Sequence, residues 1–156
     1  MSDAAKSEAE PQLRDFRHSL PMELLKAREA AMARFRPMLR DNGLTEQQWR
    51  VIRALAEFSR IDAGELAQRS FLLAPSLTRI LQHLEAEGLI QRETDSSDQR
   101  KSVLRLTARG RRLFDRIAPE SEARYADIEA TFGKERLEAL YMLLSDFYQT
   151  LGNTEA

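Results

Sequence analysis

The sequence has 156 residues, enough for one domain with a hydrophobic core, and its net charge of −1 predicts no particular partner. Because it has no cysteine and only two histidines, His18 and His83, disulfides and thiolate chemistry are excluded, and we expect neither a metal site nor a cofactor. The polar N-terminus lacks an apolar signal segment and no run is apolar enough to span a membrane, so we expect a cytoplasmic protein.

The N-terminal part predicts a tail followed by a long helix. Residues 1–15 contain few apolar side chains, which is typical of a disordered segment. Ser19 is a favourable N-cap residue and Pro21 suits a first helical turn, so we expect a helix over residues 19–42. Its interior Pro37 should kink the helix or end its regular part.

Two capping boxes predict the next two helices. Gln48 follows Thr45 by three residues and Glu65 follows Asp62 by three, which is the spacing for reciprocal capping at a helix start. Each helix would begin directly after its capping residue. The first of them has a candidate buried face made of Val51, Ile52, Leu55 and Phe58.

A fourth helix and a β-hairpin come next. Pro75 suits a first helical turn and Gly88 a helix end, and one face between them is apolar. Strand candidates follow at residues 89–92 and 103–106, joined by a polar, charged turn. The apolar face consists of Leu77, Ile80, Leu81 and Leu84.

The C-terminal part predicts two more helices. Thr107 would cap a fifth helix of roughly 20 residues that reaches Phe132, and Pro119 should bend it. A sixth helix should follow Gly133, because apolar residues recur there at helical spacing. They are Leu137, Leu140, Tyr141, Leu144, Tyr148 and Leu151.

Residues 62–107 therefore predict, in order, a short helix, a turn, an amphipathic helix and a hairpin. This order indicates a winged helix-turn-helix, which places one helix in the DNA major groove. The polar face of that helix carries groups able to contact bases or phosphates, although any surface helix has a solvated polar face. The candidate DNA contacts on the helix are Pro75, Ser76, Thr78, Arg79, Gln82 and His83.

The hairpin tip adds two cations, Arg100 and Lys101, that could reach the minor groove or its phosphates. Asp98 is better placed to orient Arg100 than to approach DNA. Residues 92–116 hold eight Arg or Lys against four Asp or Glu, whereas residues 117–156 hold three against eight. The alternative is an ordinary charged tip. The arginines that begin the fifth helix could touch the DNA backbone, but a solvated face is favoured: Arg109, Arg111, Arg112 and Arg116.

These segments resemble a known family. GELAQRS, SLTRILQHLEAEGLI and DSSDQRKSVLRLTARG are similar to the MarR family of dimeric bacterial transcription regulators, and D-Q-R-K followed by L-x-L-T-x-x-G is a fairly specific wing pattern. By helix order the resemblance spans about residues 19–151. SLPMELLKAREAAMARFRP and LTEQQWRVIRAL look most like regulators of homoprotocatechuate (3,4-dihydroxyphenylacetate) degradation operons.

The resemblance implies a mainly α fold with a small β-wing, in which a winged helix-turn-helix is flanked by N- and C-terminal dimerisation helices. It implies one domain over residues 16–156, with a DNA-binding lobe at 45–107 and dimerisation helices at 19–42 and 108–151. The recognition helix would be 75–87 and the wing 93–103. The terminal helices carry more apolar side chains than one lobe would bury, which favours a homodimer over packing within one chain.

The resemblance also implies a repressor that binds a pseudo-palindromic double-stranded operator and is released by an aromatic acid. Such a ligand needs an apolar slot, a cation and polar groups. Ser19, Arg28 and Met32 on the first helix offer these, as do Trp49 and Arg53 on the second. Alternatively, the arginines pair with acids such as Glu29 or Glu57, and Trp49 belongs to the core.

Three other functions compete with this interpretation. The chain could respond to a different phenolic acid, or it could be a ligand-insensitive DNA-binding protein. An enzyme is not expected, because the sequence has no nucleophile–base pair, phosphate loop or metal cluster.

Overall fold

The computed structural model describes residues 13–152, so most of the tail predicted over residues 1–15 lies outside the described residues. Two compact units divide the chain: the first ends at Arg34 and the second begins at Phe35.

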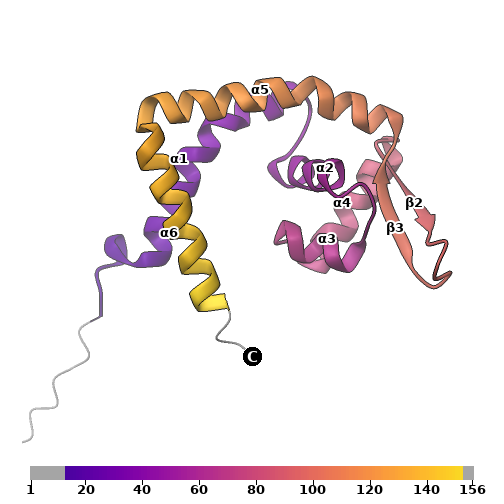
Figure 1. Ribbon diagram of the computed structural model, residues 1–156, viewed down its shortest axis with the longest axis horizontal. Coiled ribbons are helices and arrows are strands. Elements are labelled where there is room, and N and C mark those ends of the chain that lie inside the picture. Colours follow the sequence, from indigo (N-terminus) through magenta and orange to yellow (C-terminus); the bar gives the residue numbers. More distant parts are fainter. Residues whose placement is uncertain (1–12, 153–156) are drawn as a thin grey trace, which may run out of the picture. The chain divides into compact units, whose positions relative to one another are not determined.

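The helices and strands follow the predicted order, with one additional strand and a short 3-10 helix, η1 (Figure 1). In chain order the elements are η1 (Phe16–His18), α1 (Leu20–Asp41), α2 (Glu46–Glu57), β1 (Ile61–Asp62), α3 (Ala63–Ser70), α4 (Ala74–Ala86), β2 (Ile90–Thr94), β3 (Ser102–Leu106), α5 (Ala108–Phe132) and α6 (Lys134–Gly152). None of the described helices is both long enough and apolar enough to traverse a lipid bilayer.

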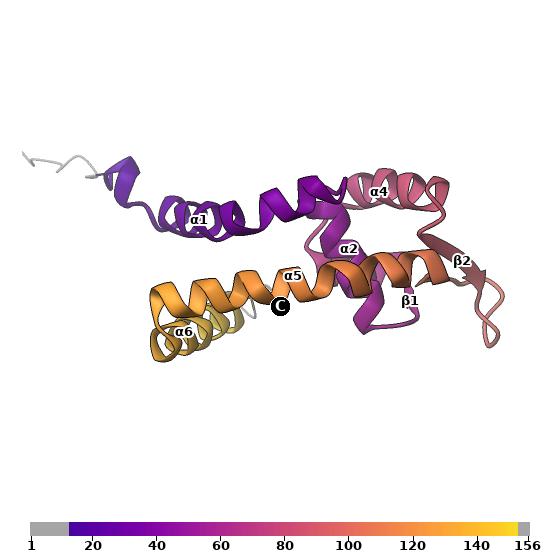
Figure 2. The same cartoon turned by 90° about the horizontal axis from the view of Figure 1, so that it is seen from above.

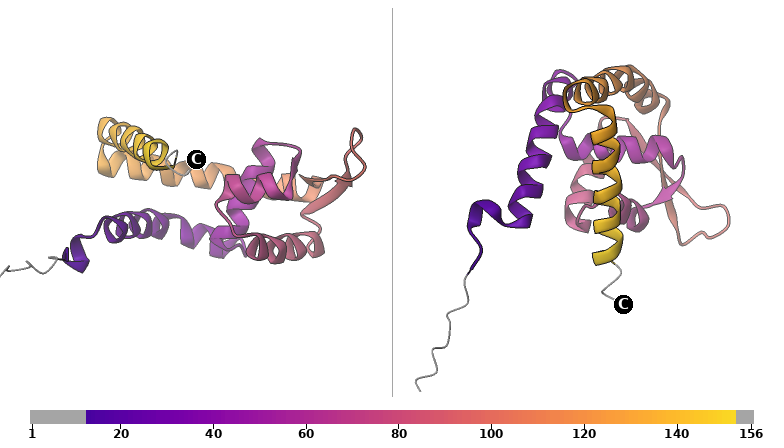
Figure 3. Two further views of the ribbon diagram at one scale, coloured as in Figure 1. Left: turned by 90° about the horizontal axis from the view of Figure 1, so that it is seen from below. Right: turned by 60° about the vertical axis from the view of Figure 1, so that its left-hand side comes forward.

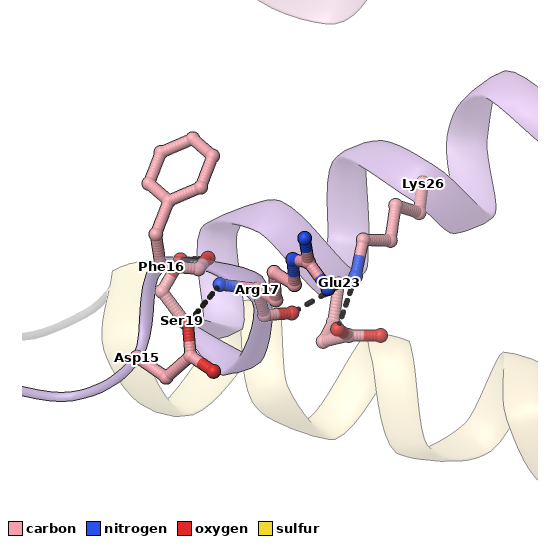
Figure 4. A network of polar contacts seen from close by, with 6 residues as sticks. All are labelled: Asp15, Phe16, Arg17, Ser19, Glu23 and Lys26. Carbon is pink, nitrogen blue, oxygen red and sulfur yellow. Dashed lines mark hydrogen bonds and ion pairs between the residues drawn. The ribbon is translucent and has the colours of Figure 1, made fainter.

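The first unit contains η1 and the start of α1, which polar contacts join (Figure 4). Ser19 stands directly before α1, as predicted for an N-cap, and its carbonyl accepts from the Glu23 N–H at 3.0 Å. Its hydroxyl donates to the Phe16 carbonyl at 3.2 Å. The Lys26 ammonium binds the Glu23 carboxylate at 2.7 Å and the Arg17 carbonyl at 2.8 Å.

Two helices continue through an internal proline. A proline removes one backbone donor, yet α1 passes through Pro37 to Asp41 and α5 passes through Pro119 to Phe132. Of the two outcomes predicted at Pro37, an end of the regular helix is therefore wrong, and a kink stays a prediction. Burial of neighbouring side chains offsets the missing hydrogen bond; they are Phe35, Met38 and Leu39 in α1 and Ile117 in α5.

The core of the second unit forms around α2. Its capping box is confirmed, with the Gln48 N–H donating to Thr45 Oγ1 at 3.1 Å and the Thr45 N–H donating to Gln48 Oε1 at 3.0 Å. The predicted apolar face is buried except at Phe58, which is half-buried under the Arg69 guanidinium. Arg50 Nη1 donates to the Ser70 carbonyl at 2.9 Å and so joins α2 to the end of α3.

Only one of the two hydrogen bonds of the capping box predicted for α3 forms. Asp62 Oδ1 accepts from the Glu65 N–H at 2.8 Å, as an N-cap should. The Glu65 carboxylate, however, accepts from Arg69 Nε at 2.8 Å, one turn further along the helix. This ion pair replaces the return half of the predicted capping box.

The sheet has three antiparallel strands in the order β1–β3–β2, whereas the sequence predicted only the β2–β3 hairpin. In β1, Ile61 pairs with Leu104 and Asp62 with Val103. A strand of two residues has too little pattern to be recognised, and its pairing depends on β3 far along the chain. Burial of Ile61 and Leu104 anchors the hairpin to the helices.

Helix α5 has 25 residues, more than the roughly 20 predicted, and runs from the hairpin past α2 to the turn before α6 (Figure 2). Its cap is as predicted, since Thr107 Oγ1 accepts from the Gly110 N–H at 3.0 Å. The same hydroxyl donates to the Gly88 carbonyl at 2.7 Å. This pair of bonds fixes the start of α5 against the end of α4.

Gly110 in the first turn of α5 lies close to the chain that follows α4. A Cβ atom at this position would collide with the Leu89 carbonyl oxygen, which already accepts from the Thr107 N–H at 3.0 Å. The glycine that closes the predicted L-x-L-T-x-x-G pattern is therefore required by backbone contact.

Helix α6 has no buried residue, although it is rich in apolar side chains. Met142 is 72% exposed and Leu143 is 67% exposed. The other exposed apolar residues of α6 are Leu140, Tyr141, Leu144, Phe147, Tyr148 and Leu151. The pKa of Tyr141 is raised, chiefly because its phenol is partly shielded from water and further by nearby Tyr125, Glu138 and Glu129.

Candidate nucleic-acid interface and effector region

Helix α4 has one buried face and one exposed face. Leu77, Ile80, Leu81 and Leu84 are all buried, as their spacing predicted. The preceding turn places Phe71 in the left-handed region with φ of 51°, and the Leu72 N–H donates back to the Ala67 carbonyl at 3.1 Å. Because α3 ends in this tight turn, α4 starts at once and presents its polar face outward.

The predicted contact residues lie along that exposed face. Thr78, Arg79, Gln82 and His83 are exposed, Pro75 is exposed in the first turn, and Ser76 is half-buried. The Thr78 hydroxyl donates to the Ala74 carbonyl at 2.9 Å, which leaves its oxygen able to accept. Within residues 13–152, Arg79 and Gln82 have no hydrogen-bond or ion-pair partner, so both can bind an external group.

The tip of the hairpin is held by two aspartates. Asp95 Oδ1 accepts from the Ser97 N–H at 2.7 Å and from the Ser97 hydroxyl at 2.5 Å, which lowers the pKa of Asp95. Asp98 Oδ1 accepts from the Arg100 N–H at 3.0 Å, and the Lys101 N–H donates to the Asp98 carbonyl at 3.0 Å. Asp98 thus contacts Arg100, the residue it was expected to orient, through the Arg100 backbone N–H.

Ion pairs neutralise the hairpin below its tip. Arg92 Nε lies 2.6 Å from the Glu85 carboxylate of α4. Arg105 Nη1 lies 2.9 Å from Glu93 Oε2, and this contact lowers the pKa of Glu93. Arg100 and Lys101 have no such partner in the described part of the chain, and the hairpin projects from the helices of the second unit (Figure 3). The two cations at the tip can therefore bind an anion.

A cation and two aromatic rings meet between α2 and the helices around it. Arg53 Nη1 donates to the phenol oxygen of Tyr125 at 3.0 Å, and its guanidinium carbon lies 5.9 Å from the centre of that ring. On its other side, Tyr125 packs against the buried Phe35, with 4.9 Å between ring centres. Arg53, Tyr125 and Phe35 together provide a cation, a hydroxyl and an apolar wall.

Trp49 lies one turn before Arg53 and is only 6% exposed. Its ring stacks on Phe114 of α5, with 5.7 Å between ring centres. The alternative that Trp49 is a core residue is therefore confirmed. Tyr125 was not predicted from the sequence, because nothing near it in the chain indicates its contact with Arg53, 72 residues earlier.

The other predicted effector residues belong to the first unit. Arg28 Nη1 lies 2.9 Å from the Glu29 carboxylate, so the pairing that the sequence left as an alternative is formed. Met32 lies one turn after Arg28 on α1, and Ser19 lies directly before the helix. Among residues 13–152, no cluster of three acidic or histidine side chains could hold a metal ion.

The helix pair α3–α4 and the hairpin define a winged helix-turn-helix protein. A model of the MarR family matches residues 42–101. The homoprotocatechuate degradative operon repressor of Escherichia coli is 46% identical over 136 residues, which cover 87% of this chain and 91% of that protein. The chain belongs to the MarR family of transcriptional regulators.

Solved structures support the same assignment. NadR in complex with 4-hydroxyphenylacetate is 39% identical, with a TM-score of 0.78 over 86% of this chain and 98% of NadR. CouR bound to a 23-mer DNA duplex is 25% identical, with a TM-score of 0.76 over 88% of this chain and 99% of CouR. The predicted family, the winged-helix fold and the resemblance to homoprotocatechuate regulators are confirmed.

Proposed function

We propose that this chain is a homodimeric repressor of an aromatic-acid catabolic operon, released when a hydroxylated phenylacetate binds. One observation carries the proposal: Arg79 and Gln82 project from an anchored helix and have no partner among residues 13–152, in a chain 46% identical to a homoprotocatechuate operon repressor. NadR, which has been solved with 4-hydroxyphenylacetate, supports the same class of effector.

In the proposed complex, α4 enters the major groove and the hairpin tip reaches the flanking minor groove. Arg79 pairs with guanine and Gln82 with adenine, because each side chain matches the paired donors and acceptors on that base edge. The remaining residues contact phosphates or position these groups. They are Pro75, Ser76, Thr78, His83, Asp98, Arg100 and Lys101.

The effector binds beside Arg53 and Tyr125 in this proposal. The Arg53 guanidinium pairs with the ligand carboxylate, and the Tyr125 hydroxyl and the Phe35 ring offer a hydrogen bond and an apolar wall. Trp49 contributes by packing α2 on α5 near Arg53. Ser19, Arg28 and Met32 stay predictions for the same role.

Two copies of the chain are needed to read a pseudo-palindromic operator, since each copy has one α4. The exposed apolar side chains of α6 support a second copy as the partner that covers them. We assign dimerisation to residues 19–42 and 108–151, DNA binding to 45–107 and the site of action to the cytoplasm.

Release of DNA follows from a difference in affinity between two dimer conformations. One conformation spaces the two α4 helices for successive major grooves, about 34 Å apart. An acid that binds the other spacing more tightly shifts the dimer toward it and weakens operator binding. The acid can act in this way because Arg53 is on α2, which packs on α3 and α4.

The proposal is tested by a gel-shift titration on DNA upstream of the protein's own gene cluster, at fixed salt and with competitor DNA. We expect specific binding that 3,4-dihydroxyphenylacetate or 4-hydroxyphenylacetate abolishes, while 4-hydroxyphenylacetamide, which lacks only the carboxylate, leaves it unchanged. Specific binding that ignores both acids would reject the effector class. Binding without sequence preference would reject the repressor function.

A further inference from the structure

A groove of about 380 Å³ lies between the end of α1, the last turns of α4 and the first turns of α5. Its apolar lining comes from Leu44, Leu84, Leu89 and Leu113. Neither Arg53 nor Tyr125 lines it, so it is separate from the proposed effector site. A volume of this size accommodates a small molecule.

Three arginines of α5 line the groove: Arg109, Arg112 and Arg116. Their spacing of three and then four residues places them on one face of the helix. None of the three has an ion pair or hydrogen bond to any residue among 13–152. Glu87 is the single carboxylate in the lining, which leaves a clear excess of positive charge.

The neighbouring Arg111 shows that this arrangement is specific to one face of α5. Arg111 Nε lies 3.5 Å from Asp115 Oδ1, and Arg111 Nη1 donates to the Ala56 carbonyl at 3.4 Å. Arg111 is therefore compensated within the protein, while the arginines on the groove face are not.

The position of these charges is unfavourable for α5 itself. The first turn of a helix carries the positive end of its dipole, so a cation there, such as Arg109 in α5, is destabilising. Like charges three or four residues apart also repel one another. An anion in the groove would relieve both effects, because it would lie against the three guanidinium groups.

We propose that this groove binds a small organic anion with at least two phosphate or carboxylate groups. Guanidinium groups bind such planar or tetrahedral oxyanions through paired hydrogen bonds, and the leucine side chains would contact the body of the ligand. His83 and Glu87 lie on and directly after α4, so the occupant touches the end of the proposed recognition helix and α5 together. The groove is thus a second small-molecule site.

The test uses the full chain with benzene-1,3-dicarboxylate, benzoate and pyrophosphate as probes, and calorimetry with NMR of the arginine Nε–Hε groups as readouts. We expect the dicarboxylate or pyrophosphate to bind about tenfold more tightly than benzoate, because a second charged group engages a second guanidinium. Arg112→Gln and Arg116→Gln should each weaken that binding by about fivefold or more. Arg111→Gln removes the same charge from the same helix and should leave it unchanged.

Circular dichroism and the melting temperature establish that each variant is folded. If Arg112→Gln does not fold, Arg116→Gln takes its place in the binding comparison. Absence of saturable binding by both the dicarboxylate and pyrophosphate overturns the proposal, as does equal binding by Arg112→Gln and the unchanged protein. If neither probe binds, yet Arg112→Gln and Arg116→Gln flatten the salt dependence of DNA binding, the groove contacts the DNA backbone and the proposal is wrong.

Discussion

Arg53 on α2 donates a hydrogen bond of 3.0 Å to the phenol oxygen of Tyr125 on α5, 72 residues later in the chain. Tyr125 is at the same time in contact with Phe35 near the end of α1. One phenol therefore joins three helices of the second unit. A ligand that competes for the Arg53 guanidinium would disturb all three, which makes this pair the natural point at which to test the effector proposal.

Replacing Tyr125 by Phe removes the hydroxyl and keeps the ring that packs on Phe35. We expect 4-hydroxyphenylacetate to bind about fivefold more weakly, because the loss of one hydrogen bond costs about 1 kcal/mol. Arg53→Gln should weaken it further, because it removes a charge-assisted bond. Calorimetry measures both affinities. Tyr148→Phe removes a hydroxyl from α6 as the control, and equal affinities in all variants would place the acid elsewhere.

Arg79→Ala tests base reading by α4. Because Arg79 is exposed and has no partner in the described chain, its removal should leave the fold intact. We expect a loss of about 1–3 kcal/mol in operator binding per half-site and a relaxed preference at one base pair. Competition gel shifts with single-base operator variants measure this preference. Arg124→Ala is the control, because Arg124 lies on α5, where it pairs with Asp127. An unchanged sequence preference of the Arg79→Ala variant would refute base reading.

Arg100→Ala tests the hairpin tip, where we propose binding to the DNA backbone. Affinity should weaken for every sequence, and the slope of log affinity against log salt should fall by about 1 for each phosphate that the arginine neutralises. Fluorescence anisotropy over a salt series gives the slope. Arg105→Ala removes a charge from the same hairpin, but that arginine is already paired with Glu93, so its effect should be smaller. Equal slopes for Arg100→Ala and the unchanged protein would exclude the phosphate interaction.

Gly110→Ala should destabilise the second unit. The new Cβ atom would collide with the Leu89 carbonyl oxygen, so the start of α5 must move away from the end of α4. We expect a loss of about 1–3 kcal/mol in the free energy of unfolding, measured by urea denaturation. At Gly152 an added Cβ atom meets only ordinary contacts at 3.8 Å from Tyr148, so Gly152→Ala should be neutral. Equal stability of both variants would contradict the collision.

The conformation of the hairpin tip should change only at acidic pH. Two hydrogen bonds from Ser97 hold the pKa of Asp95 below its ordinary value of 3.8. These bonds stabilise the charged carboxylate, so they persist at neutral pH and break only as the pH falls through the lowered pKa. NMR titration of the Asp95 carboxyl carbon and the Ser97 amide should show a shared midpoint below 3.8. A midpoint above that value would mean that the bonds do not form.

Much of the fold could be predicted from the sequence because its signals are local. Thr45 and Gln48 lie three residues apart, and their reciprocal hydrogen bonds start α2 where predicted. The leucine and isoleucine spacing of α4 likewise separated its buried face from its polar face. The family pattern identified the hairpin and the glycine at position 110, although it gave no physical reason for that glycine.

The rest depended on contacts between residues far apart in the chain. Local sequence could not show that Ile61 pairs with Leu104, or that Arg53 meets Tyr125. Nor could it show that Arg111 reaches the Ala56 carbonyl while Arg112 faces a groove, although the two are adjacent. The sequence by itself determined where helices begin and which faces are apolar, because those depend on neighbouring residues. Only the tertiary structure decided which charges and rings meet, because that depends on how the faces pack.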